Sequence, residues 1–294
     1  MAQKLISELL AEARRPLLSY EFFPPKDDTG MDKLQRVAEE LKPTKPDFVT
    51  VTFGAGGSTR ARTLQVCEYL REAGHTPVMH HLTCVGTSRE ELGDIVDRVY
   101  ESGIRNIMAL RGDPPKGESR FRPHPGGLVH ANDLVHFIKK RHPDICCGVA
   151  GYPETHQEAL SPESDIFYLK DKVDAGGAFI TTQLFYDNKS FYDFVRKCRD
   201  WGIRAPIIPG LLPPISLKQL RRMAAMCQAS LPPSLVRDLE KAGDDAENAE
   251  TIGIDWTVRQ IKDLLKHDVP AVHLYILNRS KAALAPAVKE CFGR

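Results

Sequence analysis

The chain has 294 residues, of which 42% are hydrophobic and 27% charged, and its 40 basic side chains nearly balance 39 acidic ones. This length accommodates one or two domains, including a complete α/β barrel, and the composition is ordinary for a soluble globular protein. The net charge of +1 provides no general attraction to nucleic acid or to an anionic membrane, so we expect neither as a partner. No apolar run approaches the roughly 20 residues of a membrane-spanning helix.

The first residues, MAQKLISELLAEARRP, predict an amphipathic helix and not a signal peptide, because Glu8 and Glu12 interrupt the apolar residues. The seven cysteines are odd in number and include no CxxC pair. They are typical of reduced, mostly buried thiols, so we expect a cytoplasmic protein. The spacing of Cys and His residues suggests no metal site.

Eight mostly apolar segments predict β-strands, and helical patterns lie between nearly all of them. The strands are expected at 17–23, 47–53, 77–84, 106–112, 144–152, 179–186, 206–212 and 272–277. The clearest helices are 31–41, 59–73, 88–102, 161–175 and 188–201, and the third begins with a capping box of Ser88 and Glu91.

This alternation predicts an α/β fold, a (β/α)8 TIM barrel, with a doubly wound open sheet as the alternative. The longer interval from 213 to 271 predicts a mostly helical insertion after the seventh strand. Because no composition break or linker divides the sequence, we expect a single domain over residues 1–294.

In such a barrel the chemistry takes place at the carboxyl ends of the strands. Polar residues occur at this end of nearly every predicted strand, and together they predict a functional cleft. They include Glu21, Thr52, His81, Thr83, Arg111, Asp113, Tyr152, His156, Gln183 and Tyr275.

Glu21 lies among aromatic residues in SYEFFPPK, just before two prolines. Burial disfavours the charged form of a carboxyl, which can then keep its proton near neutral pH, as a general acid must. The alternative is a strand-end glutamate that points to solvent or pairs with Lys26. Gln183, inside an apolar run, suits recognition of a heterocycle edge, or it hydrogen-bonds to backbone within the core.

Other polar positions also leave alternatives open. The stretch FGAGGSTR lacks the spacing of a dinucleotide or phosphate loop, and predicts a turn whose Ser58 or Thr59 caps the next helix. His80 and His81 are adjacent on a strand, so at most one faces the barrel. Asp113 is either a turn residue or a fixed charge beside a ligand.

With these strand ends laid out, the sequence resembles the catalytic barrel of the 5,10-methylenetetrahydrofolate reductase family. The resemblance is carried, in order from residue 19 to 281, by SYEFFPPK, VTFGAGGSTR, HLTC, MALRGDPP, GYPETH, KVDAGGAFITTQLFYD, PIIPGLLP and LYILNRS. It implies a non-covalent FAD, and ping-pong hydride transfer from NAD(P)H through flavin N5 to methylenetetrahydrofolate, which gives 5-methyltetrahydrofolate. It also implies a homo-oligomer of the short bacterial type, without a regulatory domain. The absence of an arginine cluster favours NADH.

The resemblance also implies roles for individual residues. Glu21 would protonate a ring nitrogen of the folate, and the charge of Asp113 would stabilise the resulting cationic iminium. The residues implied for folate and nicotinamide are Gln183, Met223, Tyr275 and Arg279. Those implied for FAD are Thr52, His81, Arg111, Gly112, Asp113, His130, Ala131, Tyr152, His156, Asp165, Tyr168 and Lys172.

Some of these residues depart from the family pattern or from their own periodicity. His130 stands where an aromatic residue such as tyrosine is expected, and Met223 where a phenylalanine can pack. Tyr168 and Asp171 replace more usual polar or basic residues beside the FAD phosphates. Periodicity alone would place Asp165 and Lys172 on a solvated helix face, whereas the resemblance places them on the flavin.

Two other functions remain open at this stage. Another FAD-dependent TIM-barrel oxidoreductase, similar to proline dehydrogenase, would keep the cofactor residues without needing both Glu21 and Gln183. A ligand-binding barrel without activity is the third hypothesis, against which the presence of Glu21, Asp113 and Gln183 argues.

Overall fold

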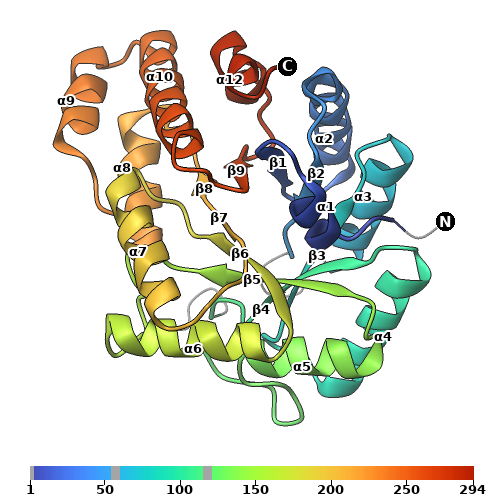
Figure 1. The fold of residues 1–294 in the computed structure, drawn as a ribbon. Coiled ribbons are helices and arrows are strands. Elements are labelled where there is room, and N and C mark those ends of the chain that lie inside the picture. Colours follow the sequence, from blue (N-terminus) through green and yellow to red (C-terminus); the bar gives the residue numbers. More distant parts are fainter. Residues whose placement is uncertain (1–2, 54–59, 115–120) are drawn as a thin grey trace.

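A computed structural model describes residues 3–53, 60–114 and 121–294 of the chain (Figure 1). The expected cap at Ser58 or Thr59 lies outside these residues. All described strands are parallel and form one sheet in the order β7-β6-β5-β4-β3-β2-β1-β9-β8. Their bounds are β1 Leu17–Phe22, β2 Phe48–Val51, β3 Val78–Thr83, β4 Asn106–Leu110, β5 Cys146–Gly151, β6 Gly177–Thr182, β7 Ile207–Ile208, β8 Gly210–Leu211 and β9 Ala271–Tyr275.

The sheet curves into a nearly closed barrel because β7 and β8 are two halves of one extended segment. β7 pairs with β6, and β8 pairs with β9 at the other end of the strand order. Pro209 separates the halves because it has no backbone N–H to donate, although its carbonyl still accepts from the N–H of His273 (2.9 Å). The predicted TIM barrel is confirmed, the doubly wound alternative is wrong, and the predicted strand at 206–212 is divided at Pro209.

The helices lie around the barrel, with the first of them across one of its ends (Figure 1). They are α1 Ile6–Glu12, α2 Asp28–Leu41, the 3-10 turn η1 Lys42–Thr44, α3 Arg60–Glu72, α4 Arg89–Glu101, α5 Ala131–Arg141, α6 Pro162–Asp174, α7 Asn188–Asp200, α8 Leu217–Cys227, α9 Pro233–Ala242, α10 Ala246–Leu265, α11 Lys281–Leu284 and α12 Pro286–Cys291. The predicted capping box is confirmed, since the Ser88 hydroxyl accepts from the N–H of Glu91, whose carboxylate accepts from the N–H of Ser88.

The amino-terminal end of the barrel is filled by apolar side chains and covered by α1. The inward-facing layer consists of Leu17, Phe48, Met79, Met108, Cys146, Phe179, Ile208 and Ala271, and Ile6 of α1 packs against it. Asn106 fixes α1 in this position, since its side chain accepts from the N–H of Ile6 (2.8 Å) and donates to the carbonyl of Lys4 (3.1 Å). The barrel is therefore closed at this end, which directs any ligand to the other end.

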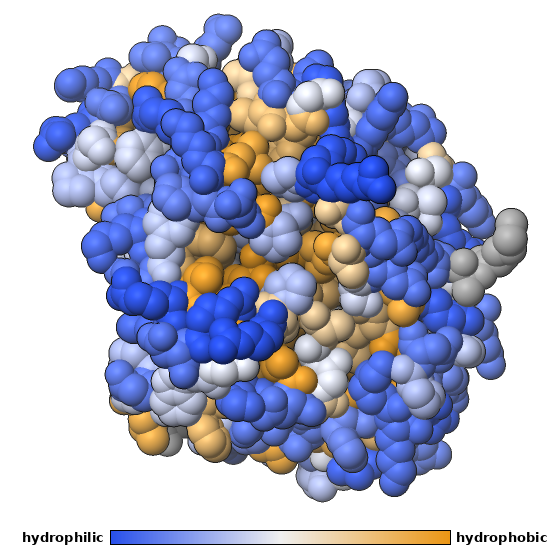
Figure 2. All heavy atoms as spheres, in the orientation of Figure 1, coloured by the Kyte–Doolittle hydropathy of each residue, from blue (hydrophilic) through white to orange (hydrophobic). Residues whose placement is uncertain are grey.

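The predicted helical insertion is confirmed as α8, α9 and α10. These helices pack around a separate apolar cluster that includes Leu184 and Tyr186 beyond β6, and Leu212 beyond β8. The insertion thus lies beside the carboxyl ends of these two strands. Figure 2 shows hydrophilic residues over much of the molecular face and apolar residues gathered toward its middle. No helix among the described residues has the length and apolarity needed to cross a membrane.

Candidate functional site

A cavity of about 370 Å³ opens at the carboxyl ends of the strands. A second cavity of about 330 Å³ adjoins it, and the two share Leu110, Arg111, Ala150, Tyr152 and His156. Both volumes lie in the range of small-molecule and cofactor sites. Every residue predicted for the site, except Arg279, lines one of these two cavities. The structure therefore brings together residues from strands that are far apart in the sequence.

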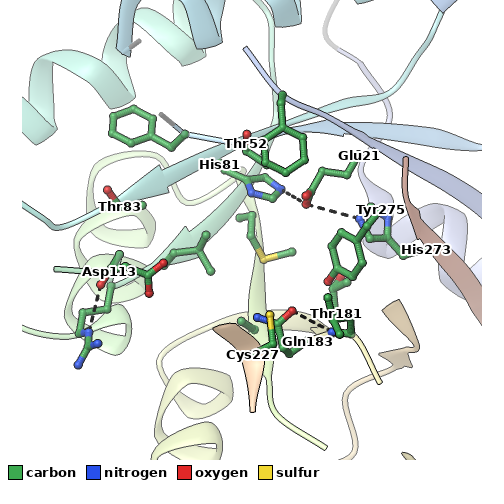
Figure 3. A pocket seen from close by; sticks show the side chains of 18 of the residues that line it. Glu21, Thr52, His81, Thr83, Asp113, Thr181, Gln183, Cys227, His273 and Tyr275 are labelled. Atoms are coloured by element: carbon green, nitrogen blue, oxygen red, sulfur yellow. Dashed lines mark hydrogen bonds and ion pairs between the residues drawn. The ribbon is translucent and has the colours of Figure 1, made fainter. Parts of the chain in front are cut away.

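Glu21 lies at the end of β1 and is 6% exposed, between two imidazole rings (Figure 3). Its Oε2 is 3.7 Å from Nε2 of His81 on β3 and 3.7 Å from Nε2 of His273 on β9. Burial lowers the pKa of His81 to about 4, so this ring is neutral at physiological pH. Glu21 is therefore turned into the cavity and not toward solvent, and its ion-pair partners among the described residues are imidazoles and not Lys26.

Tyr275 and Gln183 line the same cavity as Glu21 (Figure 3). The Tyr275 hydroxyl donates to the carbonyl of Thr182 at 2.6 Å, which holds the ring against β6. Gln183 follows β6, and its side-chain oxygen accepts from the N–H of Leu184 at 2.9 Å. The side chain of Gln183 therefore makes a hydrogen bond to the backbone and also lines the cavity.

The segment after β4 supplies three predicted residues. Gly112 has a φ of +89°, and a Cβ atom there would lie 2.9 Å from Cγ1 of Val85, so a larger residue would be both strained and crowded. Arg111 pairs with Glu158, a residue that the sequence analysis did not single out. Asp113 is exposed at the cavity edge, which fits a fixed charge beside a ligand as well as a turn residue.

The second cavity lies along α6, and Asp165 and Lys172 of that helix line it. The Lys172 ammonium donates to the carbonyl of Ala150 (2.5 Å) and lies 5.8 Å from the ring centre of Tyr152. Asp165 accepts from the N–H of His156 at 3.0 Å. Burial raises the pKa of Asp165 and lowers that of Lys172 to about 8. The solvated-face interpretation of these residues is therefore wrong.

His130, Ala131 and Tyr168 form the outer part of the second cavity. His130 and Tyr168 are exposed, and their rings are nearly parallel with centres 6.4 Å apart. Thr52, at the end of β2, and Met223, on α8, line the first cavity instead. Met223 thus brings the insertion into contact with the site, in agreement with a pliable apolar cover.

Arg279 is not in either cavity. It is exposed and borders a small neighbouring space that also contacts Tyr275 and Leu277. Leu277 and Asn278, which precede it, both have left-handed φ values of about 50°. The side chain of Asn278 donates to the carbonyl of Phe23 (2.8 Å) and accepts from its N–H (2.9 Å), so this turn is fastened to the end of β1.

His80 and His81 face opposite sides of β3, as strand alternation predicts. His81 lines the cavity, whereas His80 lies behind the strand with its ring 6.0 Å from that of Phe53. Burial lowers the pKa of His80 to about 3. Within the described ranges, no group of three or more His, Cys, Asp or Glu residues is arranged to hold a metal ion.

The sequence analysis missed three polar or polarizable residues of the first cavity: His273, Thr181 and Cys227. His273 lies two residues before Tyr275 on a strand, so period-two alternation places both on one face and could have found it. Cys227 lies four residues after Met223 on α8, on the same helix face. Thr83, which was expected at this strand end, lies two residues after His81 on β3, and its hydroxyl is buried without a hydrogen-bond partner among the described residues.

Comparisons with known proteins show the family to which the chain belongs. The sequence model of the methylenetetrahydrofolate reductase family matches residues 6–289. The chain belongs to this family. It is 38% identical over 285 residues to "Methylenetetrahydrofolate reductase (NADH) 1" of Arabidopsis thaliana, and the match covers 94% of the chain. The match covers only 48% of the plant protein, so the chain spans about half the length of this relative.

A bacterial member of the family has a similar length. The "5,10-methylenetetrahydrofolate reductase" of Escherichia coli is 35% identical over 281 residues, which cover 95% of this chain and 93% of the relative. Among solved structures, an uncharacterised Clostridium thermocellum protein that binds two copies of 5-methyl-5,6,7,8-tetrahydrofolic acid has a TM-score of 0.65 and 16% identity, with 97% of this chain and 99% of that chain covered. At this identity the likeness is one of fold.

Proposed function

We propose that the protein reduces 5,10-methylenetetrahydrofolate to 5-methyltetrahydrofolate, with FAD as the bound cofactor and NADH as the reductant. Family membership and the names of its plant and bacterial relatives support this reaction and this reductant. The observation that carries the proposal is the buried carboxyl of Glu21, which shares a cavity with the amide of Gln183. A folate-binding protein of the same fold is in agreement with the choice of substrate.

The residues of the two cavities fit FAD. His81 Nε2 and the Thr83 hydroxyl are buried without hydrogen-bond partners among the described residues, and both belong to residues that line the first cavity. Gly112 lines the first cavity with its backbone, in a left-handed conformation that favours glycine. Arg111 and Lys172 supply positive charge for a diphosphate along the second cavity. When bound, FAD would accept a hydride from the nicotinamide and deliver it to the folate.

The protein's own residues prepare the folate for this transfer. Glu21 holds a proton at the cavity floor and gives it to a ring nitrogen of the substrate, whose C–N bond then breaks with the electron pair left on that nitrogen. The exposed carboxylate of Asp113 stabilises the positive charge that develops on the methylene carbon. Gln183 orients the pterin edge with its amide, and Met223 and Tyr275 cover the ring from two sides.

Two half-reactions test the proposal. Purified protein should be yellow, and NADH should bleach it anaerobically faster than NADPH does. Methylenetetrahydrofolate should then restore the colour and be converted to 5-methyltetrahydrofolate, which chromatography would identify. Protein that holds FAD and is bleached by NADH but is never reoxidised by the folate would contradict the proposal and favour another flavin oxidoreductase.

Glu21→Gln separates the proton donor from the rest of the site. We expect folate-dependent reoxidation to slow by about 10²-fold to 10⁴-fold, the usual contribution of general acid catalysis. Bleaching by NADH should stay close to the wild-type rate, because hydride transfer from nicotinamide needs no acid. Stopped-flow absorbance of the flavin measures both steps, and an equal loss in both would show that the role of Glu21 is wrong.

Three further assignments belong to this proposal. We infer that residues 1–294 act as one catalytic barrel, because all described strands belong to one sheet. All seven cysteines are free, which supports a reducing, cytoplasmic location. The homo-oligomer expected from the family resemblance stays a prediction, and sedimentation of the holoenzyme is the measurement that checks it.

A further inference from the structure

We propose that His273, oriented by Ser19, is a positioning residue for Glu21: it turns one carboxyl oxygen toward the cavity and stabilises the carboxylate that remains after proton donation. This inference rests on the proposed function, in which Glu21 is the acid. Neither His273 nor Ser19 was predicted from the sequence.

Ser19, Glu21 and His273 form a buried group on two paired strands. Ser19 and His273 are direct partners in the register of β1 and β9, and they are 0% and 2% exposed. The Ser19 hydroxyl lies 2.8 Å from Nδ1 of His273. Glu21 is two residues beyond Ser19 on the same face of β1, so its Oε2 reaches the other ring nitrogen, Nε2, at 3.7 Å. The imidazole therefore lies between the serine and the acid, and Figure 3 shows its contact with Glu21.

The hydroxyl of Ser19 determines whether Nε2 of His273, the nitrogen that faces Glu21, carries a proton. If Ser19 donates to Nδ1, the neutral ring carries its proton on Nε2, and this N–H points to the carboxyl. The opposite tautomer would set the lone pair of Nε2 against the oxygen of a carboxylate, which is repulsive. We assign the first tautomer, because it is the one that stabilises the product of proton donation.

Two imidazoles converge on a single oxygen of Glu21, and this leaves the other oxygen for the acidic proton. Nε2 of His81 is the same 3.7 Å from Oε2 and has no hydrogen-bond partner among the described residues. These distances are too long for formed hydrogen bonds. Such contacts often tighten only when the reacting complex forms, which here would be the moment when Glu21 becomes charged.

The titratable groups that face Glu21 are His81 from β3 and His273 and Tyr275 from β9. The Tyr275 hydroxyl is already committed to the carbonyl of Thr182. Among the described residues, the ion-pair partners of Glu21 are imidazoles, and no Lys or Arg is among them. A permanent cation would hold the carboxyl charged and unable to donate, whereas a neutral N–H stabilises the anion without preventing its protonation.

A double-mutant cycle on the FAD-loaded enzyme tests this role. We expect His273→Phe to slow folate-dependent reoxidation about 10-fold to 100-fold and Ser19→Ala about 5-fold, the factors for a hydrogen bond to a charged and to a neutral group. Reduction by NADH should change less than about twofold. In a Glu21→Gln background both substitutions should lose their effect on the folate step, since they act through Glu21. Effects that multiply with that of Glu21→Gln would overturn the proposal.

A second readout needs no folate. Infrared difference spectra across a pH titration report the carboxyl band of Glu21, which is assigned by its loss in Glu21→Gln. With the His273 donor removed, or misoriented by Ser19→Ala, the carboxylate is less stable, so the protonated band should persist to higher pH than in the wild type. A band that titrates at the same pH in all variants contradicts the inference, even if the enzyme reduces folate. If the band is displaced as expected but the wild-type enzyme does not reduce the folate, the proposed function is contradicted instead.

Thr257→Val is the matched control. Thr257 is also buried, and its hydroxyl donates to the carbonyl of Gly253 at 2.8 Å within α10, outside the cavity lining. Its loss removes one buried hydroxyl without touching Glu21, so both half-reactions and the carboxyl band should match the wild type. A similar loss of folate reduction in this control would show that the Ser19 effect comes from general loosening of the barrel.

Discussion

Lys172 is the residue whose charge is most sensitive to its surroundings in the second cavity. Its ammonium donates to the Ala150 carbonyl and lies against the Tyr152 ring, where little water can solvate it. Burial lowers its pKa to about 8, and the nearby Asp165 opposes this shift. Lys172 therefore carries its charge at neutral pH and loses it at mildly alkaline pH, in the place proposed for the FAD diphosphate.

This shift predicts a pH dependence of cofactor affinity. Below about pH 8 Lys172 is protonated and attracts the diphosphate, and above it the free protein must first take up a proton. The FAD dissociation constant should therefore rise as the pH increases from about 8, by up to tenfold per pH unit. Flavin fluorescence titrations measure it. Lys172→Met should bind FAD more weakly and without this slope.

Lys170→Met is the control on the same helix, because Lys170 pairs with Asp174 and lines neither cavity. It should keep the wild-type slope. If the slope persists in Lys172→Met, another group titrates.

The residues of the site differed in how far the sequence could predict them. Glu21, Gln183 and Tyr275 could be placed because they follow strands, and strand ends meet at one edge of a barrel. Periodicity gave the wrong environment for Lys172, because a helix face can be covered by a loop that comes from the preceding strand. His273 was overlooked inside an apolar run, although its alternation with Tyr275 was visible. Arg279 belongs to the LYILNRS stretch that carries the family resemblance, but its side chain lines neither of the two cavities.

At the scale of elements, α10 lies exceptionally close to the segment after β8. A Cβ atom at Gly253 would lie 1.5 Å from the carbonyl oxygen of Pro214. Only a residue without a side chain lets the backbone of α10 approach this segment, which leads into α8 and hence to Met223. The position of the insertion over the site thus depends on one absent methyl group.

Gly253→Ala should therefore destabilise the protein by about 3 kcal/mol, the upper part of the range for overpacked cores, despite the better helix propensity of alanine. Gly93→Ala in α4 is the matched control. A Cβ there would meet only the flexible end of Arg141 at 3.2 Å, so stability should stay the same or rise by up to about 1 kcal/mol. Urea unfolding measures both, and equal stability of the two variants would contradict this account.

Elements could be predicted from the sequence better than their boundaries. Helices that begin with a side-chain cap, such as α4 after Ser88, were found within a residue or two. The seventh strand was not recognised as divided, because its two halves form one apolar run in which the effect of Pro209 depends on pairing with β6 and β9. Such pairing joins residues distant in sequence, and periodicity carries no information about it.

At the scale of the whole molecule, closure of the barrel and the shape of the cavity depend on the same contact. Gly210 begins β8, and its N–H donates to the Thr182 hydroxyl at 3.0 Å. A Cβ atom at this position would lie 2.4 Å from the carbonyl oxygen of Thr182 and 2.7 Å from the Tyr275 hydroxyl. The hydrogen bond that holds Tyr275 in the cavity therefore crosses the point where the two ends of the sheet meet.

Gly210→Ala should separate these groups. We expect a loss of about 1–3 kcal/mol in the free energy of unfolding, together with weaker folate binding because Tyr275 is displaced. Gly126→Ala, in an exposed segment where a Cβ has its nearest neighbour at 3.9 Å, should change stability by less than about 0.5 kcal/mol. Unfolding curves and folate titrations of both variants provide the measurement, and unchanged binding in Gly210→Ala would refute the link.

The apolar layer beneath the site, with α1 under it, has a consequence for how often the acid can work. Below Glu21 lie the buried Ser19 and then the apolar layer that includes Leu17. Because these apolar side chains do not hold water, a proton has no path to Glu21 through this layer. In the proposed reaction, the proton that Glu21 donates would then have to be replaced from solvent through the same opening that admits the substrate. Under this proposal, Glu21 would be reprotonated once per turnover, after the product leaves and before the next substrate covers the opening.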